Sequence, residues 1–160
     1  KFGLGICNGC QMFSQLHSII PGTDHWPLFD KNKSNQFEAR LSRVKINKSK
    51  SLFMSGMEGS ILPIVVSHGE GKIVFPSKKN TSNAIISYVD NNNKKTTEYP
   101  FNPNGSDNGS NGFTNSDGRI TIMMPHPERL FTLNQYSYHP ANWKISPWSK
   151  IFINARNWLK

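Results

Sequence analysis

The chain has 160 residues, a length typical of one domain, and its hydrophobic fraction of 36% is low for a globular core. Its formal net charge is +9, but the basic residues are scattered through Asn-rich segments without a basic stripe or interleaved aromatic residues, which argues against binding to nucleic acid. No apolar run is long enough to cross a bilayer, so we expect no membrane association. The low cysteine count favours a reducing compartment, and we expect a cytoplasmic protein.

The first predicted elements are a strand and a helix that meet at a cysteine. Residues 2–6 have the composition of a short buried strand, and the run 10–20 repeats apolar residues every three to four positions before a Pro-Gly pair. Cys7 stands between them, with Gly5 and Gly9 on either side. Small residues at these two places suit a sharp strand-to-helix turn, because a Cβ there would crowd the backbone. A helix N-terminus favours the thiolate, so the pattern predicts that Cys7 is a nucleophile.

The pair of cysteines at positions 7 and 10 has other interpretations. A zinc site needs further ligands, and His17 and His25 do not complete a known zinc spacing. A thioredoxin-like redox pair also lies at a helix start, but no βαβ unit precedes this one. A structural turn with two inert thiols is the main alternative from this segment alone.

The middle of the chain alternates between apolar runs and polar loops. Strands are predicted at 37–46, 61–66, 72–75, 84–89 and 119–124. Polar loops are predicted at 47–51, 77–81 and 91–95. Ser146 and Pro147 are typical of a helix start, and the apolar residues that follow form one face. Helices near both ends with strands between them predict an α/β fold.

A histidine framed by prolines follows the last predicted strand. The run Pro125-His126-Pro127-Glu128-Arg129 places His126 and Glu128 two residues apart, which in extended backbone points both side chains the same way. A carboxylate there can fix the imidazole tautomer, so that the other ring nitrogen exchanges a proton. The alternative is a rigid surface turn in which Glu128 pairs with Arg129 in solvent.

Together, the two segments predict a Cys7–His126–Glu128 triad whose members are remote in sequence and meet in the fold. This combination is far more specific than either part alone.

Segments spread over nearly the whole chain resemble one enzyme family. They are residues 5–12, 20–22, 25–27, 35–40, 67–71, 88–91, 102–106, 123–129 and 146–148. The cysteine turn and the Pro-His-Pro-Glu run resemble the glutaminase domain of class I glutamine amidotransferases. The tryptophan-containing and Asn-Pro-Asn-Gly segments are most similar to the C-terminal part of the large-type phosphoribosylformylglycinamidine synthases.

The resemblance implies a three-layer α/β fold around an open, mostly parallel sheet. Residues 1–160 are then expected to be a partial class I glutamine amidotransferase domain whose N-terminal part is missing, because only six residues precede Cys7. The family's second oxyanion donor comes from a glycine-rich loop upstream of the cysteine turn. Losing one such donor costs about a hundredfold or more in rate, so the isolated fragment is expected to be inactive.

The resemblance also implies a chemistry. Cys7 attacks the side-chain amide of glutamine, His126 moves the proton, Glu128 orients the imidazole and the backbone N–H of Asn8 donates to the oxyanion. The ammonia then serves ATP-dependent conversion of formylglycinamide ribonucleotide to formylglycinamidine ribonucleotide in purine biosynthesis, in synthetase domains of the same polypeptide. ATP and Mg²⁺ are expected in the synthetase part, with no cofactor or metal in this domain. The alternative is a non-catalytic interaction domain of the same fold that docks on a synthetase.

Three further residues are predicted to bind substrate, each with a structural alternative. Gln11 lies at the helix start and is expected to shape the pocket, Arg40 is suited to grip the α-carboxylate of glutamine, and His68 follows an apolar strand. Arg40 equally fits a pair with an acid on a neighbouring strand, and a loop histidine is as often structural. One departure from the family pattern is the polar run 108–112, which predicts a flexible loop that loosens the approach of His126.

Overall fold

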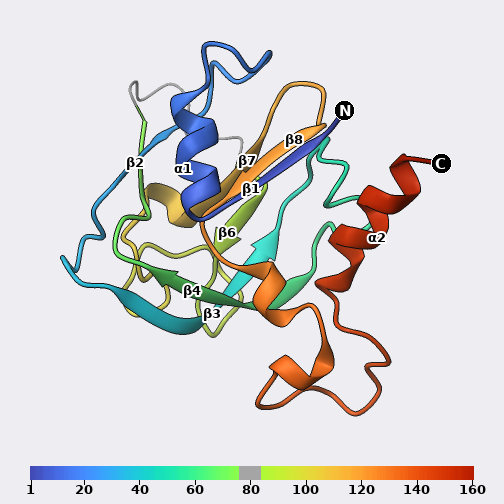
Figure 1. Cartoon of the computed structure of the whole chain (residues 1–160). Helices are drawn as coiled ribbons and strands as arrows, with labels where there is room; N and C mark the ends of the chain where they lie inside the picture. The colour runs from blue at the N-terminus through green and yellow to red at the C-terminus, as the bar shows by residue number, and fades with distance from the viewer. Residues whose placement is uncertain (76–83) are drawn as a thin grey trace.

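The computed structural model describes residues 1–75 and 84–160 of the chain (Figure 1). The predicted polar loop at 77–81 lies outside these residues. The strands are β1 (Gly3–Ile6), β2 (Leu28–Asp30), β3 (Glu38–Ile46), β4 (Ile61–His68), β5 (Lys72–Val74), β6 (Ile86–Tyr88), β7 (Ser110–Thr114) and β8 (Ile120–Met123). The α-helices are α1 (Asn8–Gln15) and α2 (Ser149–Trp158), and short 3-10 turns are η2 (Asp107–Gly109), η3 (Pro127–Leu130) and η4 (Leu133–Gln135).

The main sheet is mixed, with the order β1-β8-β7-β6-β3-β4, and β2 and β5 form a small antiparallel ladder beside it. The α/β class is confirmed. The pairing differs from the expected mostly parallel sheet, because only β1 and β8 run parallel among the described strands. The physical reason lies in the connections: a parallel pair needs a long crossover, whereas β7 turns directly into β8 and the β3–β4 link carries no helix.

Successive side chains of β1 point to opposite faces of the main sheet. Phe2, Leu4 and Ile6 pack on the core cluster that contains α2 residue Ile151, whereas a Cβ at Gly3 would contact Phe13 of α1. The two helices therefore cover opposite faces of the sheet, as Figure 1 shows on either side of β1 and β8. This arrangement is the expected three-layer sandwich.

The predicted C-terminal helix is confirmed and is anchored at its start. The Ser146 hydroxyl accepts a hydrogen bond from the backbone N–H of Trp148 at 3.2 Å, and the Trp148 indole donates to the Pro63 carbonyl at 2.7 Å. Trp148 and Ile151 are fully buried. This ties α2 to β4, close to the residues that hold His126.

The polar run 108–112 does not form the predicted flexible loop. Residues 110–114 form the buried central strand β7, which pairs with both β6 and β8. The buried side chains of Ser110 and Asn111 are polar, so the run lacks the apolar alternation that marks a strand. The segment before His126 is therefore held in the sheet.

Candidate active site

Cys7 lies on the bend between β1 and α1. Its backbone has φ 52° and ψ −110°, a conformation that is sterically costly for a residue with a side chain and that recurs at functional sites. Its N–H donates to the Met123 carbonyl at 2.9 Å, and its carbonyl accepts from the N–H of Gln11 at 3.1 Å. The parallel pairing of β1 with β8 therefore sets Cys7 beside the end of β8.

Of the two glycines predicted to be required by this turn, the structure requires one. A Cβ at Gly5 would lie 2.7 Å from the Gly9 carbonyl oxygen, which is closer than real contacts allow. A Cβ at Gly9 would meet nothing within 4 Å. The crowding argument is thus correct for Gly5 and wrong for Gly9, because the latter already sits on the open side of the helix.

His126 and Glu128 follow β8 directly. The N–H of His126 donates to the Val65 carbonyl at 2.8 Å, which fixes this residue against β4 through a single antiparallel bridge. Its Nδ1 lies 2.6 Å from Glu128 Oε1. Its Nε2 is buried and has no partner among the described residues. The imidazole is therefore oriented through one nitrogen, while the other stays free for proton transfer.

The electrostatics favour a charged imidazole at this position. The neighbouring Cys7 thiol is the largest cause, followed by the hydrogen bond with Glu128, and together they raise the pKa of His126 to about 9 against the opposing effect of burial. Burial is the largest single effect on Glu128 and would raise its pKa, but the hydrogen bond with His126, a backbone hydrogen bond and the charges of His126 and Arg129 together lower that pKa. The structure thus brings Cys7, His126 and Glu128 together.

The two cysteines have different environments. Cys10 is fully buried, and burial, followed by the proximity of Cys7, raises the pKa of its thiol well above the ordinary value. Cys7 is partly exposed, and its thiol donates a weak hydrogen bond to the Ser67 carbonyl at 3.9 Å. A neutral, fully buried thiol such as that of Cys10 is a poor nucleophile.

Asn8 and Gln11 lie on the first turns of α1. Asn8 is the first residue of the helix, so its backbone N–H has no intrahelical acceptor and is available to an anion beside Cys7. The Gln11 side chain donates to the Glu70 carbonyl. Gln11 therefore ties the helix that begins at Cys7 to the turn that follows β4.

Arg40 is held on β3 by two partners. Its guanidinium donates to Glu38 Oε2 at 2.5 Å and to the Tyr99 hydroxyl at 2.6 Å, and it lies 4.8 Å above the centre of the Tyr99 ring. The acid comes from the same strand, not from a neighbouring one as the structural alternative assumed. Contact with the α-carboxylate of glutamine stays a prediction for this residue.

His68 lies at the end of β4 and is only 4% exposed. Burial, followed by the charge of His126, lowers its pKa to about 4, so the ring is neutral at physiological pH. Its two ring nitrogens have no partner among the described residues. A Cβ at Gly71 would lie 2.1 Å from the ring, so glycine is required for His68 to pack there. Its role as a substrate contact stays a prediction.

Two buried asparagines that the sequence analysis did not assign hold the turn between His68 and Gly71 by hydrogen bonds. Asn32 donates to the His68 carbonyl at 2.7 Å and accepts from the N–H of Gly71 at 3.0 Å. Asn104 donates to the Gly71 carbonyl at 2.8 Å. The Asn-Pro-Asn-Gly run was a usable signal for Asn104, whereas nothing in the local sequence marks Asn32.

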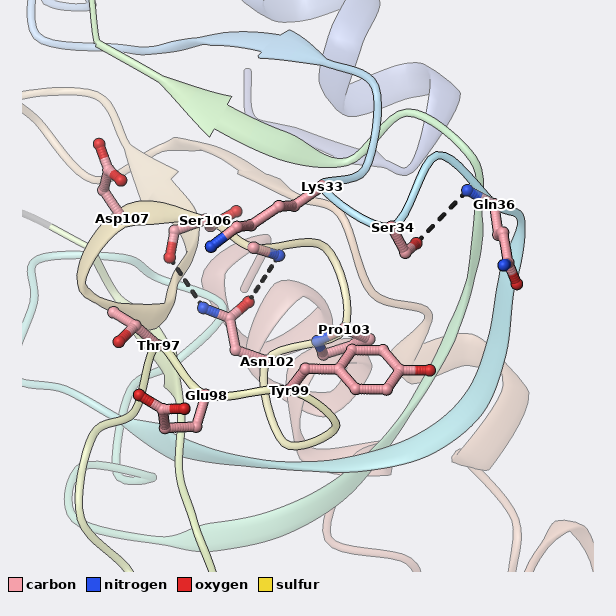
Figure 2. Close-up of a pocket in the computed structure, with 11 residues that line it drawn as sticks. Lys33, Ser34, Gln36, Thr97, Glu98, Tyr99, Asn102, Pro103, Ser106 and Asp107 are labelled. Atoms are coloured by element: carbon pink, nitrogen blue, oxygen red, sulfur yellow. Dashed lines mark hydrogen bonds between the residues drawn. The ribbon is translucent and has the colours of Figure 1, made fainter.

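A cavity of about 640 Å³ lies beside this region, between the loops that carry Lys33 and Tyr99 (Figure 2). The Asn102 side chain bridges its wall, since it donates to the Ser106 carbonyl at 2.8 Å and accepts from the N–H of Gly105 at 3.1 Å. Neither Cys7 nor His126 lines this cavity.

Within residues 1–75 and 84–160, no three His, Cys, Asp or Glu side chains gather closely enough to hold a metal ion. No helix in the same two stretches is long and apolar enough to span a bilayer.

A three-layer α/β fold with a cysteine on a strand-to-helix turn, beside a His–Glu pair, is the arrangement that the sequence resemblance to glutamine amidotransferase domains led us to expect. The chain belongs to the CobB/CobQ-like glutamine amidotransferase domain family, whose model matches residues 1–159.

Two solved structures show the same fold. The structure of PurLQS from Thermotoga maritima is 23% identical with a TM-score of 0.71, and the match covers 98% of this chain and 61% of that one. A putative GMP synthase subunit from Thermoplasma acidophilum is 15% identical with a TM-score of 0.52, covering 94% of this chain and 53% of that one. The chain thus spans about three fifths of the length of the first of these.

Proposed function

We propose that this domain hydrolyses glutamine to glutamate and ammonia with Cys7 as the nucleophile. The observation that carries the proposal is the proximity of Cys7 to an imidazole whose other nitrogen is bonded to Glu128 at 2.6 Å. Membership of a glutamine amidotransferase family supports the same substrate.

In the acylation step, the Cys7 sulfur attacks the side-chain amide carbon of glutamine. His126 already holds the proton of the thiol as an imidazolium, and it donates that proton to the departing nitrogen as the C–N bond breaks. Glu128 stabilises the charged imidazole, and the N–H of Asn8 donates to the oxyanion. The products are ammonia and a γ-glutamyl thioester, which water then hydrolyses.

The ammonia is proposed to serve the ATP-dependent conversion of formylglycinamide ribonucleotide to formylglycinamidine ribonucleotide. The sequence resemblance to phosphoribosylformylglycinamidine synthases and the fold shared with PurLQS support this destination. The partner would then be the synthetase part of the same polypeptide, where ATP and Mg²⁺ bind, in the cytoplasm. The net charge of +9 favours an acidic surface on that partner.

Gln11, Arg40 and His68 are proposed to form the glutamine side of the site. Arg40 offers a planar cation for the α-carboxylate, as a bidentate contact requires. Gln11 and His68 lie at the turn that closes over Cys7, where the Ser67 carbonyl contacts the thiol.

The test is glutamine hydrolysis by the complete polypeptide that carries this domain. Cys7→Ala is expected to abolish ammonia release, whereas Cys10→Ala is the matched control and is expected to retain it. A non-catalytic interaction domain would instead show no glutamine hydrolysis in either variant or in the unmodified protein, although it would still bind the synthetase.

A further inference from the structure

The run Ser146-Pro147-Trp148 takes no part in the chemical steps described above. Ser146 is only 1% exposed, and Trp148 is fully buried at the start of α2. Buried polar groups in folded proteins have specific hydrogen-bond partners. The partners of these two side chains lie on η3, which carries Glu128, and on β4, which holds His126.

The Ser146 hydroxyl makes three hydrogen bonds, which use its full capacity. It donates to the carbonyl of Leu130, the last residue of η3, and it accepts from the backbone N–H of Trp148 at 3.2 Å. The Tyr136 hydroxyl lies 2.9 Å away and is the donor in this third bond, because the single proton of Ser146 is already given to Leu130. The turn that carries Glu128 is therefore held at its end by a hydroxyl that is itself fixed from two sides.

Trp148 acts at the other end of this turn, through β4. Its indole N–H donates to the Pro63 carbonyl at 2.7 Å. Two residues further along β4, the Val65 carbonyl accepts from the N–H of His126 at 2.8 Å. Carbonyls two residues apart on a strand point the same way, and β4 is the outermost strand on its side of the main sheet. Trp148 and His126 therefore bond successive outward carbonyls of one sheet edge.

The segment 126–130 is thus held at both ends, and the bond within it depends on this support. Glu128 reaches back to His126 Nδ1 at 2.6 Å. The side chain of Glu128 is 38% exposed, so burial alone does not keep it in place, and its direction follows the backbone of η3. A displacement of about 1 Å in such a group can cost about a hundredfold in rate.

We propose that Ser146 and Trp148 are positioning residues for the glutaminase reaction. They hold the segment 126–130 where its imidazole is aligned with Cys7 and Glu128. The proposal rests on the glutaminase function proposed above. In the part of the chain that the structure describes, neither side chain bonds a residue proposed to bind glutamine. Their loss should therefore lower kcat and leave KM nearly unchanged.

Packing alone is the structural alternative, since Trp148 and Leu130 belong to the same apolar core cluster. A packing role would change stability, and it would not change kcat of the folded protein. The geometry favours positioning, because packing requires neither the bond from the indole to the edge of β4 nor a buried hydroxyl with three partners.

The test compares matched variants of the complete polypeptide at a temperature where each one is folded. Ser146→Ala removes the bond to Leu130. Its control, Ser149→Ala, removes a hydroxyl that bonds the Ser146 carbonyl at 2.7 Å at the start of the same helix. Ser146→Ala is expected to lower kcat for glutamine hydrolysis by about tenfold or more, with KM changed by less than about twofold. Ser149→Ala is expected to keep the kcat of the unmodified protein.

A second pair of variants probes the other end of the segment. Trp148→Phe keeps an aromatic ring but removes the N–H that bonds Pro63. Its control, Trp158→Phe, makes the same change near the end of α2, where the ring packs against Phe2. Trp148→Phe is expected to lower kcat by about tenfold without a matching change in KM, and Trp158→Phe is expected to leave both unchanged.

The position of the imidazole has a readout of its own, which does not depend on turnover. The bond with Glu128 helps to raise the pKa of His126. An NMR titration of Cys7→Ala protein should therefore give a lower pKa for His126 when Ser146→Ala is added. Adding Ser149→Ala should leave that pKa unchanged.

Normal kcat in Ser146→Ala, or an equal loss in Ser146→Ala and Ser149→Ala, would overturn the proposal. Failure of both Ser146→Ala and Trp148→Phe to fold would also overturn it, since the run would then serve the core alone. If the unmodified protein hydrolyses no glutamine, the proposed glutaminase function fails, while the titration still decides whether Ser146 positions His126.

Discussion

His126 Nδ1 lies 2.6 Å from Glu128 Oε1, across a single proline. This bond leaves Nε2 as the nitrogen available to Cys7, and it stabilises the imidazolium that forms when the thiol gives up its proton. Pro127 occupies the first position of η3 and limits the backbone between the two side chains.

Glu128→Gln should lower kcat for glutamine hydrolysis by about a hundredfold or more, because the imidazole loses the charge that orients it and favours its protonated form. KM should change little. Steady-state kinetics of the complete polypeptide measure both, and a variant with normal kcat would exclude Glu128 from the reaction.

The stability of the domain should depend on the protonation of His126. Its pKa is raised from 6.5 to about 9 in the folded state, so the stabilisation is fully present below about pH 6.5 and is lost as the pH rises through 9. Cys7→Ala removes the largest cause of the shift. Denaturant unfolding at pH 6 and pH 9.5 should therefore show a smaller loss of stability in Cys7→Ala than in the unmodified protein, and an NMR titration of His126 should show a lower pKa in the variant.

Gly5→Ala and Gly9→Ala form a matched pair of substitutions at the cysteine turn. Gly5→Ala places a methyl group 2.7 Å from the Gly9 carbonyl oxygen, so it should lower the free energy of unfolding by about 1–3 kcal/mol. Gly9→Ala points into open space on a helix and should be neutral or stabilising by up to about 1 kcal/mol. Equal destabilisation by both changes would contradict this account of the turn.

Arg40→Gln should raise KM for glutamine by about tenfold with little change in kcat, as expected when one contact to the α-carboxylate is lost. Tyr99→Phe is the control, since it removes a hydrogen bond to Arg40 but keeps the guanidinium. If Arg40→Gln lowers stability and leaves KM unchanged, Arg40 serves only to pair Glu38.

The sequence predicted the turn at Cys7 and the pair at 126 and 128 because each depends on local chemistry: glycine next to the bend, proline on either side of the histidine. It predicted the strands at 37–46 and 61–66 to within two residues, because β-branched and other apolar residues are concentrated there, with partial alternation along the first. These features are set by near neighbours in the chain.

Other features depended on contacts between distant segments. Strand β7 is polar in sequence and becomes central only because β6 and β8 pair with it from both sides. The mixed character of the sheet follows from the connections, and the clamp by Asn32 joins residues 36 positions apart. No local pattern carries such information.

The most direct test of the central claim is covalent labelling of the complete polypeptide with a glutamine-mimicking electrophile, followed by peptide mass spectrometry. We predict a stoichiometric adduct at Cys7, none at the buried Cys10, and loss of labelling in His126→Ala. Equal labelling of the two cysteines, or no labelling of Cys7, would contradict the proposal that Cys7 is the activated nucleophile of this domain.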